Sequence, residues 1–316
     1  MAKRKPSELN LLLAVDKPVG ITSHDVVSKV RRALGERRVG HAGTLDPLAS
    51  GVMIVGVGRA TRLLGRVTLD RKRYLARITF GAETTTDDAE GEVTRTAPAT
   101  DDLSSRLFAS SILKDFLGEQ EQVPPAYSAI SIDGVRSYKR ARAGEDVDLP
   151  ARTIEVYAAD LVAIDEVDGH VVWTASFDVS KGTYIRSLAR DIGRAAGNAA
   201  HISDLRRTAS GPVTAGMCLR IEDLSCEGAR AAALDPAVVL GMPVRTLSDA
   251  ELAAVLNGRA IPNHFAGGSL GRPADAPIDT PCALTHGGQL CAIASSEGDS
   301  LRMETVFPQG IEGVAQ

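Results

Sequence analysis

The chain has 316 residues, of which 44% are apolar and 24% charged, values that suit a globular protein with one large domain and one small appended module. Its four cysteines form no C-x-x-C pair and its N-terminus is basic and polar, which argues against disulfides, a signal peptide or a membrane span and predicts a cytoplasmic protein. The net charge of −4 argues against a nucleic-acid partner, but residues 1–77 hold 16 Lys and Arg against 6 Asp and Glu, a net charge of +10, which is typical of a phosphate-facing surface or of a solvated basic face.

The N-terminal residues predict a short strand followed by a helix. The apolar run at 11–15 indicates a buried strand. After a turn, Thr22 or Ser23 is placed to cap a helix that runs through residues 26–34, and Gly35 is placed to end it.

Two apolar segments follow around a loop. Residues 39–51 form a stretch rich in glycine and proline, and the continuous apolar run at 52–58 suits a buried strand. Apolar side chains alternate over residues 73–80, as on one face of a strand. The side chains of that face are Tyr74, Ala76, Ile78 and Phe80.

The middle of the chain adds a helix, a strand and a second helix. A polar loop at 84–92 precedes an amphipathic helix predicted over residues 100–117. Residues 170–179 alternate like a strand and lead into a helix over 185–193. Strands outnumber helices and the connections are long, so the pattern predicts an α+β domain, residues 1–240, built on a mixed, largely antiparallel sheet.

Past residue 240 the composition changes. Residues 247–252 hold a capping box with a hydrophobic staple, which predicts a short helix that ends at Gly258. A stretch rich in Gly, Pro and Asp follows at 266–281, and the next two runs resemble short strands, at 282–288 and 289–296. We therefore expect residues 241–316 to form a small β-rich module with a flexible insertion.

Most common catalytic signatures are missing from the sequence. It holds no P-loop, no dinucleotide-binding glycine motif, no H-E-x-x-H and no G-x-S-x-G, and its six histidines are not spaced as metal ligands. What remains is the segment 40–51, where Asp46 precedes Pro47 in a loop stiffened by proline and freed by glycine. An aspartate in such a loop either has a fixed geometry for chemistry or completes a turn by bonding to its own backbone.

The twelve residues 40–51 resemble the G-H-x-G-x-L-D-P-x-A-x-G signature of the TruB family of tRNA pseudouridine synthases. Five further segments resemble other motifs of that family, in the family's order: residues 16–23, 72–74, 123–129, 180–186 and 205–207. The C-terminal module is similar to the family's PUA domain, with an apparent insertion near 267–280.

The resemblance implies a catalytic domain of the pseudouridine-synthase type that converts uridine 55 in the T-loop of tRNA into pseudouridine, with no metal or other cofactor. Asp46 would be the nucleophile on a flipped-out base, since a carboxylate can form a covalent intermediate that separates glycosidic cleavage from carbon–carbon bond formation. Asp46 must be ionised, and the permanently charged Arg186 is the family's candidate partner. Tyr184 precedes Arg186 by two residues, so in an extended segment both side chains would point the same way.

Two more family positions concern the flipped base. Tyr74 matches the aromatic residue that stacks on the uracil and whose hydroxyl is a proposed base; stacking recovers about 1–3 kcal/mol of the cost of extrusion. The other possible role of Tyr74 is that of an ordinary core residue of the strand. His41 matches the residue that enters the space left by the base, and its alternative is an ordinary loop histidine.

Other matches concern substrate binding. Lys17 and Leu205 match active-site positions, with a solvent lysine and a core leucine as alternatives. Asp88 also matches, although the family often has an acidic pair slightly earlier, where this chain has threonines. Candidates for the phosphate-facing set are Arg31, Arg32, Arg37, Arg38, Arg59, Arg62, Arg71, Lys72 and Arg73.

The expected partner is tRNA, recognised by the shape of its T-arm. We expect the protein to act as a monomer, with no membrane association and no obligate protein partner. Two other readings compete: an RNA-binding folding helper without chemistry, and an enzyme that works inside a guide-RNA complex. The intact set of Asp46, Tyr74 and Arg186 argues against the first, and the short chain without a long basic tail argues against the second.

Overall fold

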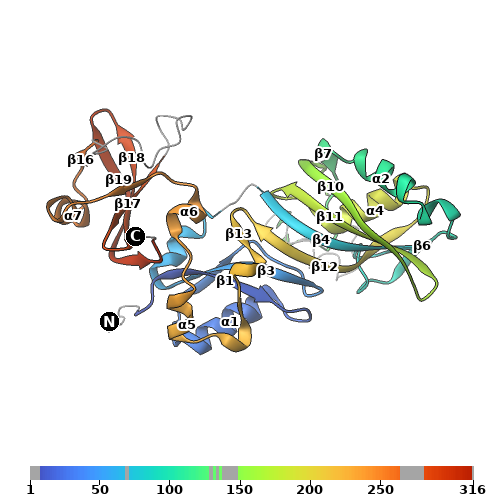
Figure 1. The fold of residues 1–316 in the computed structure, drawn as a ribbon, viewed down its shortest axis with the longest axis horizontal. Helices are drawn as coiled ribbons and strands as arrows, with labels where there is room; N and C mark the ends of the chain where they lie inside the picture. Colours follow the sequence, from blue (N-terminus) through green and yellow to red (C-terminus); the bar gives the residue numbers. More distant parts are fainter. Residues whose placement is uncertain are drawn as a thin grey trace. The chain divides into compact units, whose positions relative to one another are not determined.

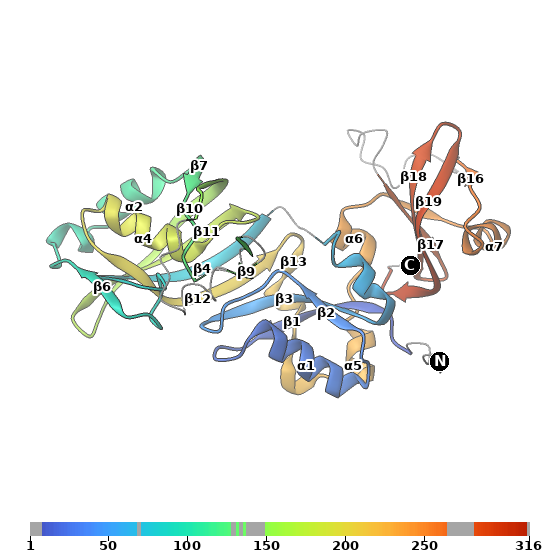
Figure 2. The same ribbon diagram turned by 180° about the vertical axis from the view of Figure 1, so that it is seen from behind.

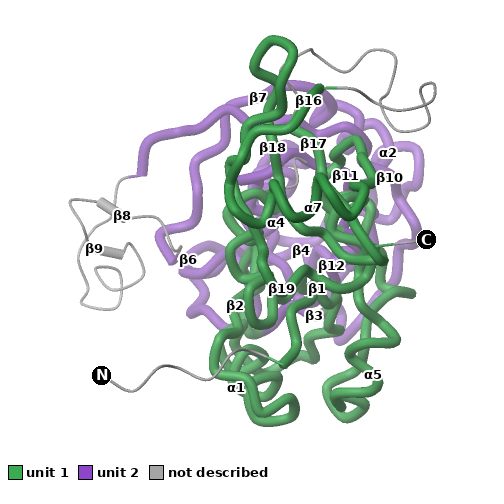
Figure 3. The backbone as a smooth tube through the Cα atoms, turned by 90° about the vertical axis from the view of Figure 1, so that its left-hand side faces the viewer, with its two compact units in different colours: residues 1–47, 51–69, 210–316 green, residues 48–50, 70–209 purple. Residues whose placement is uncertain are grey.

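The computed structural model describes residues 8–67, 71–127, 131–132, 135–136, 149–263 and 281–314. The chain divides into two compact units (Figure 3). Unit 1 consists of residues 1–47, 51–69 and 210–316, and unit 2 of residues 48–50 and 70–209. Within the described residues, no helix combines the length and apolar character needed to cross a membrane.

Unit 1 contains the N-terminal strands and the C-terminal sheet (Figure 1). Its elements are β1 (Leu11–Lys17), α1 (Ser23–Leu34), β2 (Val39–Ala42), β3 (Ala49–Val57), η1 (Gly58–Leu63), β13 (Val213–Thr214), η3 (Ala215–Met217), β14 (Leu219–Arg220), η4 (Ile221–Asp223), α5 (Cys226–Ala231), α6 (Pro236–Leu240), β15 (Val244–Thr246), α7 (Asp249–Leu256), β16 (Ile261–Pro262), β17 (Cys282–His286), β18 (Gln289–Glu297) and β19 (Ser300–Glu312).

The first strand, β1, is buried on both faces. It lies between β14, which runs parallel to it, and β3, which runs antiparallel. Leu11, Leu13 and Val15 belong to the apolar cluster that packs on α1. Leu12 and Ala14 alternate with them and belong to the cluster that includes the C-terminal sheet. The continuous apolar run of β1 therefore serves two cores.

The predicted helix after β1 is confirmed. The side chain of Thr22 accepts a hydrogen bond from the backbone N–H of Asp25 at 3.1 Å, and the Asp25 carboxylate bonds back to Thr22 in a capping box. Gly35 ends α1 in the left-handed conformation, with φ of 62°. Thr22, rather than Ser23, is the N-cap, because its backbone is extended and the helix already includes Ser23.

The C-terminal part is β-rich, as predicted. Its strands lie in the order β15-β17-β18-β19-β16. The predicted capping box joins Ser248 and Glu251 at the start of α7, which ends at Leu256. β19 was not predicted, because Pro308 and Gly310 interrupt its apolar pattern. The insertion predicted near 267–280 lies outside the described residues.

Unit 2 is built on a sheet of long strands (Figure 2). Its elements are β4 (Arg71–Phe80), β5 (Ala82–Thr84), β6 (Val93–Thr96), η2 (Asp101–Ser104), α2 (Arg106–Lys114), β7 (Gly118–Gln122), β8 (Ser131–Ile132), β9 (Val135–Arg136), β10 (Arg152–Val167), β11 (His170–Ser180), α4 (Ile185–Ala195) and β12 (Ala200–Ser210). The main sheet of this unit has the order β12-β4-β11-β10-β7.

The alternation predicted for two central strands is confirmed. In β4, Tyr74, Ala76, Ile78 and Phe80 are all buried, and β4 pairs antiparallel with β11. Trp173 of β11 is fully buried against this face, and its indole N–H donates to the carbonyl of Leu103 at 2.7 Å. The mixed α+β, largely antiparallel architecture expected from the sequence is therefore correct.

Two predictions for this unit need correction. The single helix over 100–117 is wrong: η2 and α2 are separated by Ser105, whose extended backbone breaks the helix while its hydroxyl caps α2. The strand β10 was missed. Irregular pairing between Val156 and Ala158, and again between Leu161 and Ala163, shifts the alternation twice and hides its period of two.

Candidate active site

In unit 1, the loop that carries Asp46 is held from both sides. The hydroxyl of Ser23 accepts a hydrogen bond from the N–H of Leu45 at 2.9 Å and donates to the carbonyl of Leu45 at 3.0 Å. The carbonyl of Pro47 accepts from the Nζ of Lys17 at 3.2 Å and from the N–H of Gly20 at 2.9 Å. The backbone on each side of Asp46 is therefore fixed by the segment that joins β1 to α1, and Asp46 itself is partly exposed.

Lys17 lies inside the protein rather than in solvent. Its side chain has no exposed surface, and its ammonium group also donates to the carbonyl of Pro18 at 3.0 Å. A buried cation needs such partners. These contacts make Lys17 a support for the Asp46 loop.

His41 lies just before this loop, at the end of β2, and is partly buried. Its ring meets the ring of His24 edge to face, with 5.8 Å between centroids. His24 belongs to the first turn of α1, so α1 contributes to both ends of the loop through His24 and Ser23.

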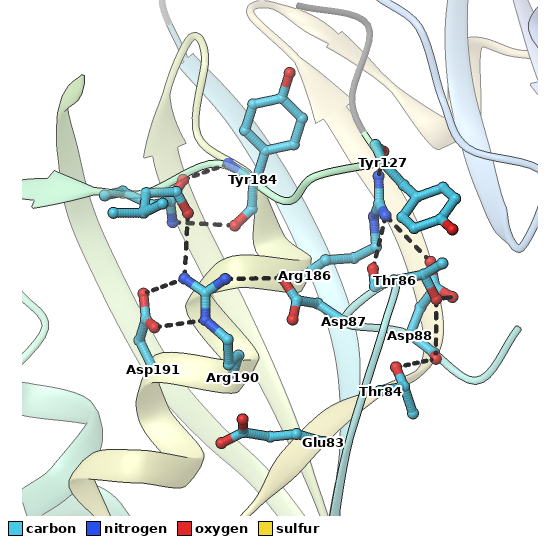
Figure 4. A network of polar contacts seen from close by, with 12 residues as sticks. Glu83, Thr84, Thr86, Asp87, Asp88, Tyr127, Tyr184, Arg186, Arg190 and Asp191 are labelled. Carbon is cyan, nitrogen blue, oxygen red and sulfur yellow. Dashed lines mark hydrogen bonds and ion pairs between the residues drawn. The ribbon is translucent and has the colours of Figure 1, made fainter. Parts of the chain in front are cut away.

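In unit 2, Arg186 is a buried cation in the first turn of α4 (Figure 4). Its Nη1 donates to the carbonyl of Thr86 at 2.8 Å and lies 3.4 Å from a carboxylate oxygen of Asp88. Its Nη2 donates to the carbonyl of Tyr127 at 3.0 Å. The other oxygen of Asp88 accepts from the Thr86 hydroxyl at 2.5 Å and from the N–H of Glu90 at 3.0 Å.

Tyr184 and Arg186 do not share an extended segment, so the expectation that they point the same way is wrong. The helix begins at Ile185, and Tyr184 is its N-cap residue. The backbone of Tyr184 is bonded twice to the side-chain amide of Gln122, at 2.8 and 3.1 Å. Its ring lies under the guanidinium of Arg152, 5.6 Å from the centroid.

Tyr74 and Leu205 lie on strands of the same sheet. Tyr74 is opposite Phe177 in the pairing of β4 with β11 and is 8% exposed. Leu205 lies on β12, the other neighbour of β4, and is 5% exposed. Each residue is mostly buried, with a small accessible edge.

Sequence reasoning missed a row of ion pairs along α4. Arg186, Arg190 and Arg194 are spaced by four residues, so they share one face of the helix. Arg190 pairs with Asp87 at 3.0 Å, and Arg194 with Glu83 at 2.8 Å. The signal was present in the sequence: three arginines at helical spacing, and three acids within residues 83–88.

The pKa values of two of these acids shift in opposite directions. Burial raises the pKa of Asp87 to about 6, although Arg190 and Arg186 lower it. Burial also raises the pKa of Glu83, but hydrogen bonds from Arg194 and Arg95 outweigh it and bring the pKa to about 2. Two arginines bond directly to Glu83, whereas Asp87 has one close cation and the like charge of Asp191 nearby.

Most of the basic residues proposed for phosphate contact are exposed, whether or not they also have partners within the protein. Some have partners within the protein: Arg31 donates to the carbonyl of Val39, Arg62 donates to the carbonyl of Val306, and Arg71 pairs with Asp178 at 2.7 Å. Arg32, Arg37 and Arg73 are exposed as well. Arg38 is partly exposed, and its backbone N–H donates to Glu36.

The candidate residues are divided between the units. Lys17, Arg37, Arg38, His41 and Asp46 belong to unit 1, and Tyr74, Asp88, Tyr184, Arg186 and Leu205 belong to unit 2. The expected pairing of Asp46 with Arg186 joins the two units and stays a prediction.

Two family models match the chain. The TruB family pseudouridylate synthase (N terminal domain) matches residues 31–185, and the tRNA pseudouridylate synthase B C-terminal domain matches residues 186–242. Among curated proteins, tRNA pseudouridine synthase B of Thermobifida fusca (strain YX) is 46% identical over 300 residues, covering 94% of this chain and 98% of that protein. The protein of the same name from Nocardia farcinica (strain IFM 10152) is 44% identical over 314 residues, covering 98% and 97%.

Solved structures with this fold include a Cbf5-Nop10-Gar1 complex. One of its chains aligns with a TM-score of 0.67 and 27% identity, covering 94% of this chain and 84% of that one. An H/ACA RNP bound to a substrate RNA containing 2'-deoxyuridine aligns with a TM-score of 0.68 at 24% identity and supports the fold alone.

Proposed function

The chain belongs to the TruB family of tRNA pseudouridine synthases and isomerises uridine to pseudouridine in tRNA, and we propose that its target is the uridine at position 55 in the T-loop. The observation that carries the site assignment is the Asp46 loop. Hydrogen bonds from Lys17, Gly20 and Ser23 hold its backbone on both sides of Asp46. A rigid backbone around a partly exposed carboxylate is what a nucleophile in a base-flipping enzyme requires.

The reaction rearranges one bond of the nucleoside. The Asp46 carboxylate adds to the nucleoside, and the bond between N1 and C1′ breaks. The uracil then turns so that C5 bonds to C1′, the carboxylate leaves, and the hydrogen on C5 is lost as a proton while N1 gains one. We assign Tyr74 to stacking on the base, with its hydroxyl as the base that takes the C5 proton.

Arg186 is proposed as the cation that orients Asp46 in the complex with RNA. Its guanidinium is buried and fixed by Thr86, Asp88 and Tyr127, so its position is set before substrate binds. Tyr184, at the N-terminus of α4, is assigned to the same pocket. His41 and Leu205 are assigned to contacts with the RNA around the extruded base.

The recognition of RNA is assigned to shape and charge. Arg37 and Arg38 lie just after α1 and are proposed to contact phosphates. We keep the division into a catalytic domain, residues 1–240, and a PUA-like RNA-binding domain, residues 241–316. We also propose that the enzyme works as a monomer in the cytoplasm without an obligate protein partner.

The test is an assay of the purified protein alone on an unmodified tRNA transcript. We expect pseudouridine at position 55 for the wild type, and none for Asp46→Asn, which keeps the size of the side chain but not its charge. The affinity of Asp46→Asn for tRNA should stay within a few-fold of wild type. Turnover by a clean Asp46→Asn preparation contradicts the nucleophile assignment. A wild type that binds tRNA without turnover supports an RNA-binding folding helper. Activity only with an added guide RNA supports an enzyme that works inside a guide-RNA complex.

A further inference from the structure

Arg190 makes contacts that the reaction described above does not use. Its Nη1 donates to a carboxylate oxygen of Asp87 at 3.0 Å, and its Nη2 donates to the carbonyl of Val123 at 3.2 Å. Its Nε and Nη2 also donate to the two carboxylate oxygens of Asp191, at 2.9 and 3.3 Å. All three nitrogens of the guanidinium therefore donate hydrogen bonds within the protein (Figure 4).

Arg190 and Arg186 hold the same two segments, one helical turn apart. Arg186 bonds to Thr86 and Asp88 in the segment 84–90 and to the carbonyl of Tyr127. Arg190 bonds to Asp87 in the same segment and to Val123, four residues before Tyr127. The segments 84–90 and 122–127 are thus joined to α4 at two successive turns.

Asp87 adopts an unfavourable conformation to make this contact. Its φ is 58°, a left-handed backbone that aspartate tolerates better than most residues but at a cost. The residue is 7% exposed, so the carboxylate also loses hydration. This backbone turn lets the consecutive residues Asp87 and Asp88 reach consecutive turns of α4. Strain of this kind persists where the surroundings hold it, and such positions gather at functional sites.

We propose that the Asp87–Arg190 pair is a positioning device for the reaction: it fixes the segment 84–90 against α4 so that Asp88 and Thr86 hold the Arg186 guanidinium in its working orientation. The proposal rests on the assignment of Arg186 to the active site. Asp87 and Arg190 touch neither substrate nor reacting atoms in this scheme; they act through Arg186.

The experiment compares Asp87→Asn and Arg190→Lys with a matched control. Arg190→Lys keeps the charge but cannot reach Asp87, Asp191 and Val123 together. The control is Asp168→Asn, because Asp168 also has a left-handed backbone, with φ of 52°, but is exposed at the turn between β10 and β11. We expect both test variants to lower kcat by about tenfold to a hundredfold with KM and tRNA affinity nearly unchanged, and the control to match wild type.

A double-mutant cycle separates positioning from general support of the fold. If Asp87 acts through the Arg186–Asp88 pair, then Asp87→Asn costs little further activity once Asp88→Asn is present. Additive losses, or losses that follow the melting temperature, overturn the proposal, as does wild-type kcat in both Asp87→Asn and Arg190→Lys. Full activity of Asp88→Asn and of Arg186→Lys instead overturns the assignment of Arg186 to the site, so the two failures are distinguishable.

Discussion

The guanidinium of Arg194 meets the carboxylate of Glu83 through two parallel hydrogen bonds, from Nε to Oε1 at 3.0 Å and from Nη2 to Oε2 at 2.8 Å. Arg95 adds two more to Oε1, from its Nη2 at 2.6 Å and from its Nε at 3.1 Å. The pair ties the end of α4 to β5, outside the residues assigned to the reaction. Among the ion pairs along α4, we expect the Arg194–Glu83 pair to contribute to stability alone.

Glu83→Gln should therefore destabilise the protein in a pH-dependent way. The pKa of Glu83 is lowered from 4.5 to about 2 in the folded protein, so its stabilisation is complete above pH 4.5 and is lost as the pH falls towards 2. Because Arg194 and Arg95 are 56% and 45% exposed, screening reduces the effect. We expect the free energy of unfolding to fall by about 1–2 kcal/mol at pH 7. Denaturant unfolding at pH 7 and pH 3 measures this, with the exposed Glu119→Gln as control; a loss as large at pH 3 as at pH 7 contradicts it.

The effect of Asp87→Asn on the free energy of unfolding should depend on pH in the opposite direction. The pKa of Asp87 is raised from 3.8 to about 6, so the folded wild type binds the proton more tightly and loses stability as the pH rises from about 4 to 6. The variant does not titrate there. We expect the free energy of unfolding of Asp87→Asn, minus that of the wild type, to rise by about 2 kcal/mol between pH 4 and pH 8. Parallel stability curves for the two proteins would show that Asp87 ionises normally.

Arg186→Lys should lower turnover far more than it lowers RNA affinity. Lysine keeps the charge, but a single ammonium group cannot bond at once to Thr86, Tyr127 and Asp88 as the planar fork does. We expect single-turnover rates to fall by about a hundredfold and the tRNA dissociation constant to change by a few-fold. Arg95→Lys, at a half-exposed site, is the control. Wild-type turnover in Arg186→Lys rules out a role for the guanidinium in the site.

Ser23→Ala should weaken the hold on the Asp46 loop. The variant loses both hydrogen bonds to Leu45 and leaves the buried backbone groups without that partner. We expect a loss of about 1–2 kcal/mol in the free energy of unfolding and about a tenfold fall in kcat. The matched control is Ser28→Ala, on the exposed face of the same helix, where the hydroxyl bonds to the carbonyl of His24. If both variants behave alike in kcat, the loop does not depend on Ser23.

Arg37→Ala should reduce the salt dependence of tRNA binding. Each lost phosphate contact lowers the slope of log affinity against log salt by about one unit. Arg62→Ala is the control within the same basic region, because Arg62 donates to Val306 and lies over the ring of Phe307. We expect Arg62→Ala to lower the melting temperature and to leave the slope unchanged. Equal slopes for wild type and Arg37→Ala mean that this arginine is only solvated.

The sequence predicts the central strands and the ends of the first helix well, because the signals are local. Tyr74, Ala76, Ile78 and Phe80 alternate without interruption, and Thr22 and Gly35 have the side chains that helix ends need. The sequence does not predict β10, because local signals are not enough there. Its alternation is broken by two irregularities that only its pairing with β11 explains.

The candidate site shows a similar limit. Motif resemblance identifies Arg186 and Asp88, and the structure brings them to 3.4 Å. It says nothing of Arg190 and Asp87, since their contact depends on a left-handed backbone at Asp87 and on a helix more than a hundred positions away in the chain. Likewise, the burial of Lys17 follows from two carbonyls that surround its amine, and no pattern in the sequence marks them.

Unit 1 is completed only by the last third of the chain, and this sets an order on its synthesis. β1 pairs with β14 through Val15 and Leu219, the N–H of Leu234 donates to the carbonyl of Leu12, and the N–H of Glu312 donates to the carbonyl of Asn10. Unit 2, by contrast, is almost wholly the unbroken stretch 70–209. On the ribosome, unit 2 can fold as it emerges, while β1 waits with one edge and one apolar face open until residues 219–312 arrive. The N-terminal strand is thus exposed to aggregation until late in translation, and is a segment that a chaperone would shield.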